Sequence, residues 1–421
     1  MSSSLLTRSI DPVSGLHSGA SSAKRRFTGK RVAMVTFSAY PYDPRPRRAI
    51  DALIGEGASI DLICLGDKGA PRRETLNGVK VVRIPLNHDR RGRVQYAYRY
   101  GIFILISSVI FALRSLARAY DLVYVHNMPD ILVLSAVVPK VFGARVVLDL
   151  HDPMPELMRT IFGASDESKS VQLLKKMEKW SIARSDLTIT VNAACQRIFS
   201  NRSCALDKIA VVMNSPDERI FPVCEADPAM QNRDKNRPFV IMYHGSLVER
   251  NGLDLAIGAL AQVRQAIPTA ELRVFGAQTT FLDRMMEFAK EKNLQEKVHF
   301  FGPRRLEDLV KEIQKCDLGV IPNRKNAFTD INTPTRIFEY LALGKPVIAP
   351  STTGITDYFN QESLLFFESG DVDQLAKQIE YAFLHPRELY EITRRGQEVY
   401  LDHMWDRERE ILLSRIGGIL G

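Results

Sequence analysis

An arginine and a glutamate lie about one helical turn apart near the start of a predicted helix. This helix begins at Thr333, contains Arg336 and Glu339, and ends at Gly344. We expect Thr333 to cap its amino end and Pro334 to occupy its first turn. The positive end of the helix dipole, together with Arg336, would bind a phosphate, and the carboxylate would bind the hydroxyl groups of a ribose or sugar. This segment therefore indicates a sugar nucleotide as ligand.

A histidine follows a buried apolar run in the segment LDLHDPMPE. His151 comes directly after Leu150, with Asp149 and Asp152 on either side. These carboxylates can accept hydrogen bonds from the ring, which would orient the imidazole and raise its basicity. A histidine beside a strand can also be purely structural, and both interpretations stay open from the residues alone.

Two further loops after predicted strands contain residues suited to ligand binding. The first, SAYPYDPRPRR, has no glycine and offers Tyr42, Arg45 and Arg47 to an anionic or hydroxylated substrate. The alternative is a proline-stiffened turn whose arginines face solvent. The second, YHGSLVERNG, has Gly245, where backbone can approach a pyrophosphate, and Arg250 near the start of the next helix. An ordinary strand-to-helix turn is the alternative there.

Short β-branched runs alternate with helical segments, and this alternation occurs twice along the chain. The first set of runs covers residues 31–37, 59–65, 79–84, 122–125, 145–150, 187–191 and 209–213; the second covers 239–243, 271–275, 298–301, 318–321, 346–349 and 364–367. Such alternation predicts parallel sheets covered on both faces. We therefore predict an α/β fold of two Rossmann-like, doubly wound domains facing a central cleft, with ligands at the carboxyl ends of the strands.

The predicted organisation has four parts. Residues 1–29, rich in Ser and Arg, are expected to form a disordered tail. The first domain would span 30–216 and the second 217–398, and a helix in 399–421 could pack back on the first domain.

Positive charge is concentrated in the first third of the chain. Residues 1–120 contain 20 Lys and Arg against 8 Asp and Glu, whereas the remainder contains 37 against 41. An anionic membrane, a phosphorylated substrate or a nucleic acid would each explain this asymmetry, as would a solvated basic face. Nucleic acid is disfavoured because stacking aromatics are not interleaved with the basic residues. Five cysteines without metal-ligand spacing favour a reducing cytoplasmic compartment.

The most hydrophobic run is Ile102 to Leu113, IFILISSVIFAL, between Arg99 and Arg114. About a dozen residues are too few to span a bilayer. The run is expected to form either a buried helix or a helix in the membrane interface, and its basic flanks favour the interface.

The order and spacing of these motifs resemble glycosyltransferase family 4, a family of retaining enzymes with the GT-B fold. The resemblance runs from about Arg31 to Leu413, and its strongest part is TPTRIFEYLALGKPVIA. Supporting segments are YPYDPRPRRAIDALIGEGASIDLICLG, VHNMPDILVLSA, DLHDPMPE, VVMNSPDERIFP and YHGSLVERNGLDLAI. The resemblance implies that the second domain binds a nucleotide-diphosphate sugar and the basic first domain binds the acceptor.

Site residues follow from this resemblance. Glu339 would hold the ribose of the donor, and His151 would reach the transferred sugar as a catalytic group. Donor contacts are also expected from Gly245, Ser246 and the helix start at Thr333, Pro334 and Thr335. Acceptor contacts are expected from Tyr42, Arg45, Arg47 and Asp152.

This chain departs from the family pattern at the donor site. Ile331 stands where the family often has a glutamate that contacts the donor sugar, and Asp330 is one place off. The family usually has an Arg and a Lys that bind the diphosphate, and at these positions this chain has Ser246 and Asn251. We expect Arg250 and Arg336 to supply that charge and to act catalytically.

The predicted function is therefore a retaining glycosyltransferase, hexosyl or related, acting on a saccharide or lipid-linked acceptor in surface polysaccharide synthesis. No metal or other cofactor is expected, because no DxD-like carboxylate pair lies in a suitable loop. The enzyme would be cytoplasmic, and its basic first domain could bind the inner face of the cytoplasmic membrane. A sugar-nucleotide epimerase of the same fold and a non-catalytic binding protein derived from it are the alternatives.

Overall fold

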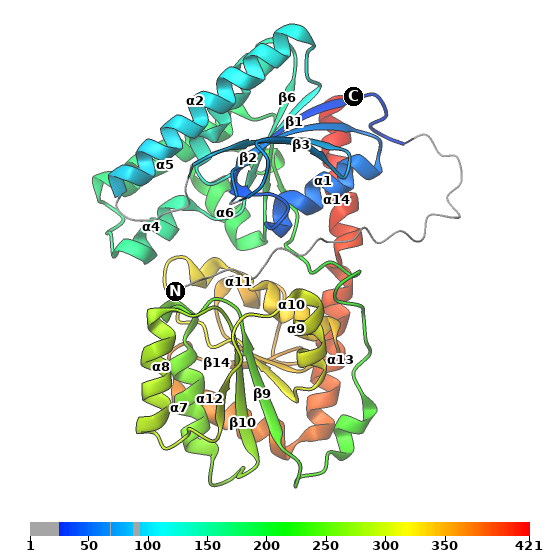
Figure 1. Ribbon diagram of the computed structural model, residues 1–421. Helices are drawn as coiled ribbons and strands as arrows, with labels where there is room; N and C mark the ends of the chain where they lie inside the picture. Colours follow the sequence, from blue (N-terminus) through cyan, green and yellow to red (C-terminus); the bar gives the residue numbers. More distant parts are fainter. Residues whose placement is uncertain (1–24, 68, 87–92) are drawn as a thin grey trace.

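The computed structural model describes residues 25–67, 69–86 and 93–421, which form two α/β domains stacked end to end (Figure 1). The first domain contains an eight-stranded sheet in the order β3-β4-β2-β1-β5-β6-β7-β8, parallel except for β3. Its strands are β1 Arg31–Ala39, β2 Ser59–Leu65, β3 Arg73–Leu76, β4 Val79–Ile84, β5 Leu122–His126, β6 Arg145–Leu150, β7 Leu187–Thr190 and β8 Ile209–Val211. The predicted parallel sheet is thus present, with one short antiparallel strand at its edge.

Helices cover both faces of this sheet. They are α1 Pro44–Gly55, α2 Arg93–Ala117, the 3₁₀ helix η1 Asp130–Ala136, α3 Val137–Val141, α4 Met154–Phe162, α5 Lys169–Arg184, α6 Ala193–Arg202 and η2 Leu206–Lys208. The helical segment between β5 and β6 is thus a 3₁₀ helix followed by a short α-helix. Apolar side chains fill the space between sheet and helices in two clusters, one on each face.

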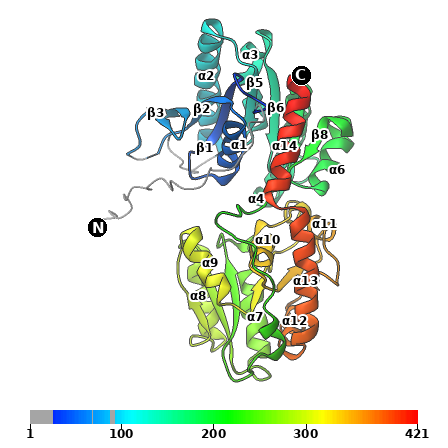
Figure 2. The same ribbon diagram turned by 90° about the vertical axis from the view of Figure 1, so that its right-hand side faces the viewer.

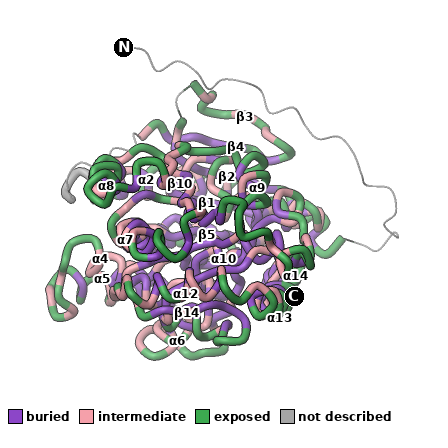
Figure 3. Tube along the Cα trace, turned by 90° about the horizontal axis from the view of Figure 1, so that it is seen from below, coloured by how far each residue is buried: buried purple, intermediate pink, exposed green. Residues whose placement is uncertain are grey.

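The second domain contains a six-stranded parallel sheet in the order β11-β10-β9-β12-β13-β14. Its strands are β9 Phe239–His244, β10 Ala270–Phe275, β11 Val298–Phe300, β12 Leu318–Val320, β13 Val347–Pro350 and β14 Leu365–Phe367. Its helices are η3 Pro228–Asn232, η4 Glu249–Asn251, α7 Leu253–Val263, α8 Thr280–Glu291, α9 Leu306–Gln314, η5 Thr329–Ile331, α10 Thr335–Ala342, α11 Thr353–Thr356, α12 Val372–Leu384 and α13 Pro386–Asp402. In both domains the strands are largely buried, and the outer turns of the covering helices are exposed (Figure 3).

The chain crosses between the domains twice. After β8 it passes into the second domain, and after α13 it returns as α14 Trp405–Leu420, which packs against α1, β6 and β7 of the first domain (Figure 2). Glu408 accepts a hydrogen bond from the backbone N–H of Met213 at 2.7 Å. The C-terminal helix therefore belongs structurally to the first domain.

The beginning of the described chain is more ordered than its composition indicates. Residues 1–24 of the expected tail lie outside the described residues, but residues 25–29 form a turn. Phe27 is 3% exposed in the apolar cluster that also contains Trp405, and Arg26 forms a bidentate ion pair with Glu410. One aromatic side chain is enough to fix this turn, and composition did not predict it.

Helix α2 is about twice as long as the apolar run identified in the sequence. Within it, Tyr98–Ala117 is long and apolar enough to cross a membrane by length and composition, and 22% of the tested window is buried. The prediction of a run too short to span was therefore wrong, because the helix continues past Arg99 and Arg114. Its inner side packs on the sheet, where the rings of Phe37 and Phe103 lie 5.0 Å apart.

Candidate active site

Both sheets have a topological switch point at the end where the predicted site residues lie. In the first sheet β1 has β2 on one side and β5 on the other, and in the second β9 lies between β10 and β12. Loops that leave such strands diverge and open a crevice at the carboxyl ends. Asn192, which follows β7, donates hydrogen bonds to the carbonyl of Ile331 and to Thr333 Oγ1 at 2.8 and 3.1 Å. The carboxyl-end loops of the two domains are therefore in contact.

Arg336 joins the two strands at the switch point of the second domain. Its Nη1 donates to the carbonyl of His244 at the end of β9 (2.8 Å), and its Nη2 donates to Asn323 Oδ1 after β12 (3.0 Å). Gly245 makes this possible, since a Cβ there would lie 3.2 Å from Arg336 Cδ and its φ is +124°. The guanidinium of Arg336 is thus held rigidly beside the turn at Gly245, which follows β9.

Glu339 is anchored by a histidine that the sequence reasoning did not use. Its Oε2 lies 2.6 Å from Nε2 of His244. Nδ1 of His244 is 2.9 Å from the hydroxyl of Tyr340, which in turn donates to the carbonyl of Met242 at 2.7 Å. This chain of hydrogen bonds holds one carboxylate oxygen of Glu339 and leaves Oε1 for a ligand. Its side chain is 15% exposed, so a ligand can reach it.

The start of α10 differs from the expected capped helix. The helix begins at Thr335, and Pro334 is the N-cap, so no side chain caps the helix. The Thr333 hydroxyl instead donates to the carbonyl of Gly354 at 2.6 Å and accepts from Asn192. The predicted cap was wrong because Thr333 forms part of the contact between the domains. The first backbone N–H groups of α10 are thereby left without a side-chain cap, as an anion site requires.

Arg250 has no ion pair or side-chain hydrogen bond among the residues that the structure describes. It lies half-buried in η4, after the exposed Ser246. Burial raises the pKa of Asp152 in the first domain, and the charges of Arg45 and Arg250 oppose that increase. Arg250 therefore acts electrostatically across the gap between the domains.

In the first domain, His151 is stacked on a second histidine. The rings of His126, the last residue of β5, and His151 are 5.3 Å apart and inclined by 6°. His126 Nδ1 lies 3.1 Å from His151 Nε2. The backbone N–H of His151 donates to Asn127 Oδ1 at 2.9 Å, which fixes the loop after β6 to the loop after β5. Sequence reasoning missed His126, although its position at the end of a buried strand matches that of His151.

A buried carboxylate completes this group. Asp149 Oδ2 accepts a hydrogen bond from Tyr124 at 2.8 Å and lies 3.4 Å from His126 Nδ1. Burial alone would raise the pKa of Asp149, but the neighbouring His151 and His126 lower it to about 2. Burial lowers the pKa of His151 to about 3. The carboxylate is therefore charged and His151 neutral at physiological pH.

The predicted acceptor residues are only partly brought together. Arg45 pairs with Asp43 at 3.3 Å and approaches Asp152 at 3.9 Å, close to His151. Arg47 instead lies near the carboxylates of Asp51 and Asp217, and Tyr42 is 69% exposed. Of these four residues, Arg45 and Asp152 adjoin the buried histidines.

His126, Asp149 and His151 present ligand atoms within 4.8 Å of one another, so a cation site must be considered. A cavity of about 20 Å³ beside this group is lined by Arg45 and Arg48. Burial lowers the pKa of Arg48 to about 10, which leaves its guanidinium charged at neutral pH. Two guanidinium groups make the cavity unfavourable for a cation, and the three residues fit a hydrogen-bonded relay better than a metal site.

Ile331, at the position of the family's first glutamate, is buried between the domains. It is 9% exposed and packs with the apolar cluster of the first domain. The neighbouring Asp330 accepts hydrogen bonds from the backbone and hydroxyl of Thr353. Neither side chain is thus free to replace that glutamate in this conformation.

The buried, neutral state of His151 has a consequence for stability. The unfolded chain takes up a proton near the ordinary value of 6.5, whereas the folded chain does so near pH 3. The free energy of unfolding should therefore fall as the pH decreases from 6.5 to 3, because the unfolded state binds more protons. His151→Gln should remove on the order of 3 kcal/mol of the difference between pH 7 and pH 4, measured by urea unfolding.

The matched control is His385→Gln, since the His385 side chain is 46% exposed. This variant should keep the acid dependence of the wild type. An unchanged acid dependence in His151→Gln would show that this imidazole is not held neutral.

Two family models match this chain. Residues 225–399 match the family Glycosyl transferases group 1, and residues 42–215 match the Glycosyl transferase 4-like domain. A curated relative, glycogen synthase of Mycobacterium tuberculosis, is 24% identical over 180 residues; this match covers 42% of the chain and 41% of the relative.

Solved structures resemble the whole chain. Sucrose-phosphate synthase from Thermosynechococcus elongatus has a TM-score of 0.72 at 17% identity, over 93% of this chain and 98% of that one. Anabaena HepE in complex with UDP has a TM-score of 0.68 at 16% identity, over 92% and 100%. At this identity they show the fold, and the two matching domains show the family. The chain belongs to the GT-B glycosyltransferases of the family 4-like type.

Proposed function

We propose that this protein transfers a sugar, with retention of anomeric configuration, from a nucleoside diphosphate sugar to a saccharide or lipid-linked acceptor of a surface polysaccharide. The observation that carries this proposal is the arrangement around α10. Arg336 and the uncapped helix start lie beside Gly245, and Glu339 is fixed by His244 at 2.6 Å. These groups offer a phosphate site and a hydroxyl site one helical turn apart.

The donor diphosphate would lie at the amino end of α10. As the glycosidic bond breaks, negative charge grows on the leaving phosphate, and donors already fixed in place stabilise it with little reorganisation. Arg336 is held by two hydrogen bonds and acts as a fixed charge. Arg250, without a partner among the described residues, is the group that can move to the phosphate. The Oε1 oxygen of Glu339 would accept hydrogen bonds from the ribose.

His151 would contact a hydroxyl group of the transferred sugar. A neutral imidazole can both donate and accept a hydrogen bond, which suits a hydroxyl better than a charged phosphate. Nδ1 of His151 has no hydrogen-bond partner among the described residues, although it lies 3.6 Å from Asp149 Oδ1. His126 would act as a positioning residue, because its ring lies parallel to that of His151 and shares a hydrogen-bond contact with it.

The acceptor hydroxyl would attack the anomeric carbon from the face that the diphosphate leaves. The C–O bond to the diphosphate breaks, the new C–O bond forms on the same face, and the departing phosphate takes the hydroxyl proton. Exclusion of water between the domains would limit hydrolysis. The acceptor would lie on the first domain beside Arg45 and Asp152, and the basic first third of the chain favours work at the inner face of the cytoplasmic membrane.

This function is tested by nuclear magnetic resonance with UDP and GDP sugars and a panel of saccharide acceptors. We expect a product whose new bond has the anomeric configuration of the donor sugar, with release of the nucleoside diphosphate. An inverted product would refute retention. A sugar that changes while still attached to the nucleotide would identify an epimerase instead.

Donor binding should depend on Glu339. Glu339→Ala removes the expected ribose acceptor and leaves His244 unpaired, so the Kd for the nucleoside diphosphate should rise about 10- to 100-fold, as for loss of a charged hydrogen bond. Isothermal titration calorimetry measures this directly. Glu362→Ala, whose side chain is 71% exposed in the same domain, serves as the control and should bind as the wild type does. Equal affinity in both variants would remove Glu339 from the site.

We further propose that catalysis requires no metal. Prolonged treatment with EDTA followed by gel filtration should leave kcat unchanged, since the leaving phosphate is stabilised by Arg250, Arg336 and α10. Loss of activity that added Mn²⁺ or Zn²⁺ restores would instead assign His126, Asp149 and His151 as ligands.

A further inference from the structure

The outer side of α2 is apolar although it faces solvent. Leu105, Val109, Leu113 and Leu116 are 64%, 49%, 63% and 66% exposed. Their spacing of three and four residues places them in one stripe along the helix. Phe103, on the opposite side, is fully buried. Helix α2 is thus apolar on both sides, whereas a surface helix of a soluble domain is normally polar on its outer side.

The polar side chains of this helix do not make its outer side hydrophilic. Ser107 Oγ donates to the carbonyl of Phe103 at 2.7 Å, and Ser108 Oγ donates to the carbonyl of Ile104 at 2.6 Å. Both hydroxyl donors are therefore satisfied within the helix, as is common for serines in apolar surroundings.

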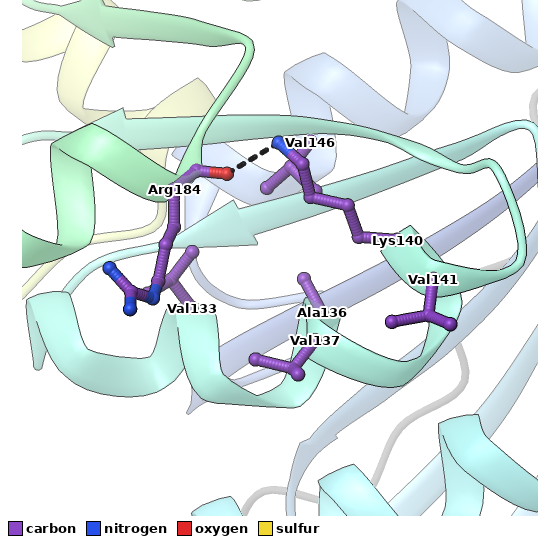
Figure 4. A pocket seen from close by; sticks show the side chains of 7 residues that line it. All are labelled: Val133, Ala136, Val137, Lys140, Val141, Val146 and Arg184. Atoms are coloured by element: carbon purple, nitrogen blue, oxygen red, sulfur yellow. Dashed lines mark hydrogen bonds between the residues drawn. The ribbon is translucent and has the colours of Figure 1, made fainter.

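The apolar surface continues onto α3, which packs against α2. Val137, Val141 and Phe142 are 43%, 80% and 44% exposed. Beside them is a pocket of about 260 Å³, with apolar lining from η1, α3 and β6, and with Lys140 and Arg184 at its edge (Figure 4). We call the exposed residues of α2 and α3, together with this pocket, the α2–α3 face. Contiguous exposed apolar surface of this kind marks an interaction site.

Basic residues surround the α2–α3 face. From Arg93 to Arg118 the chain has four arginines and no carboxylate, and one of the four, Arg114, is paired with the buried Asp61 at 3.7 Å. Arg145 and Arg184 are exposed near the pocket, where Lys140 and Arg145 share a single carboxylate, that of Asp186, at 3.0 and 3.9 Å. The face therefore combines an apolar centre with a positive margin, the combination that binds anionic lipid surfaces.

The pocket is not a second part of the acceptor site. Val146, which lines it, is five residues before His151 on β6, a separation of roughly 17 Å along a strand. In a βαβ unit, however, α2 runs back along the sheet from the carboxyl edge, so its first turns lie at the end that carries His151. A bilayer that binds the full length of α2 would therefore lie beside the end of the sheet that carries His151.

We propose that the α2–α3 face binds an anionic lipid bilayer, with α2 lying in the plane of the interface and the exposed Arg118, Arg145 and Arg184 among the headgroups. The idea that the membrane also presents the acceptor rests on the proposed function. Binding of this face to a membrane does not depend on that function. A second copy of this chain is a poorer occupant. A two-fold contact would set the same arginines against one another, with no carboxylate on α2 to pair with them.

The test is flotation of the full chain with phosphatidylcholine vesicles, with and without phosphatidylglycerol. We expect binding to the anionic vesicles at low salt and its loss as salt increases. Leu105→Glu/Leu113→Glu and, separately, Arg118→Gln/Arg145→Gln should each weaken partitioning by roughly tenfold or more. All four side chains are exposed, so the fold should persist. Leu384→Glu, 49% exposed in the second domain, is the matched control and should bind as the wild type does.

Three outcomes would overturn the proposal. The first is that the wild type does not bind anionic vesicles, and the second is that it binds neutral and anionic vesicles equally. The third is that Leu105→Glu/Leu113→Glu binds anionic vesicles as strongly as the wild type does. A wild-type dimer that Leu105→Glu/Leu113→Glu converts to a monomer would assign the face to a second copy. Nucleoside diphosphate affinity, measured on each variant without vesicles, separates failure of docking from failure of the proposed function.

Discussion

The guanidinium of Arg336 holds together the part of the molecule on which the candidate site depends. It contacts the end of β9 and the loop after β12, the two strands at which the second sheet changes direction. At a switch point the loops that follow two neighbouring strands diverge. The guanidinium of Arg336 lies between these two loops and bonds to both, so it fixes their separation. Gly245 must lack a side chain for this contact, and Glu339 projects from the same helix one turn later. The helix start, the glycine turn and the carboxylate thus form one rigid unit, where we propose that the donor binds.

The first-domain half of the candidate site is built from a different kind of interaction. Tyr124, Asp149, His126 and His151 form a buried polar chain between neighbouring parallel strands. Hydrogen bonds within the group replace part of those that burial removes from water, whereas His126 Nε2 and His151 Nδ1 have no partner among the described residues. In the proposed site, a neutral imidazole in the first domain would favour hydroxyl groups, and the fixed positive charge in the second domain would favour phosphates.

Much of this was predictable from local pattern. The β-branched runs located every parallel strand to within a few residues, because a strand buried on both faces needs continuous apolar sequence. The end of a strand predicted a role for His151, and the start of a helix predicted one for Glu339. Local pattern did not identify His126 and His244, since their roles depend on partners 25 and 95 residues away. Thr333 was misassigned for the same reason: its partners, Asn192 and Gly354, belong to another domain and another loop. The antiparallel β3 was missed because its four half-exposed residues have no apolar pattern.

The return of α14 to the first domain has a mechanical consequence. Two chain crossings connect the domains, one near Ser215 and one near His403, and the hydroxyl of Ser215 donates to the carbonyl of His403. A single linker would let one domain swivel freely on the other. Two linkers that are hydrogen-bonded to each other define one axis of rotation between the domains. Relative motion of the two domains should then be mainly a rotation about that axis, which would preserve the mutual alignment of His151 and Arg250.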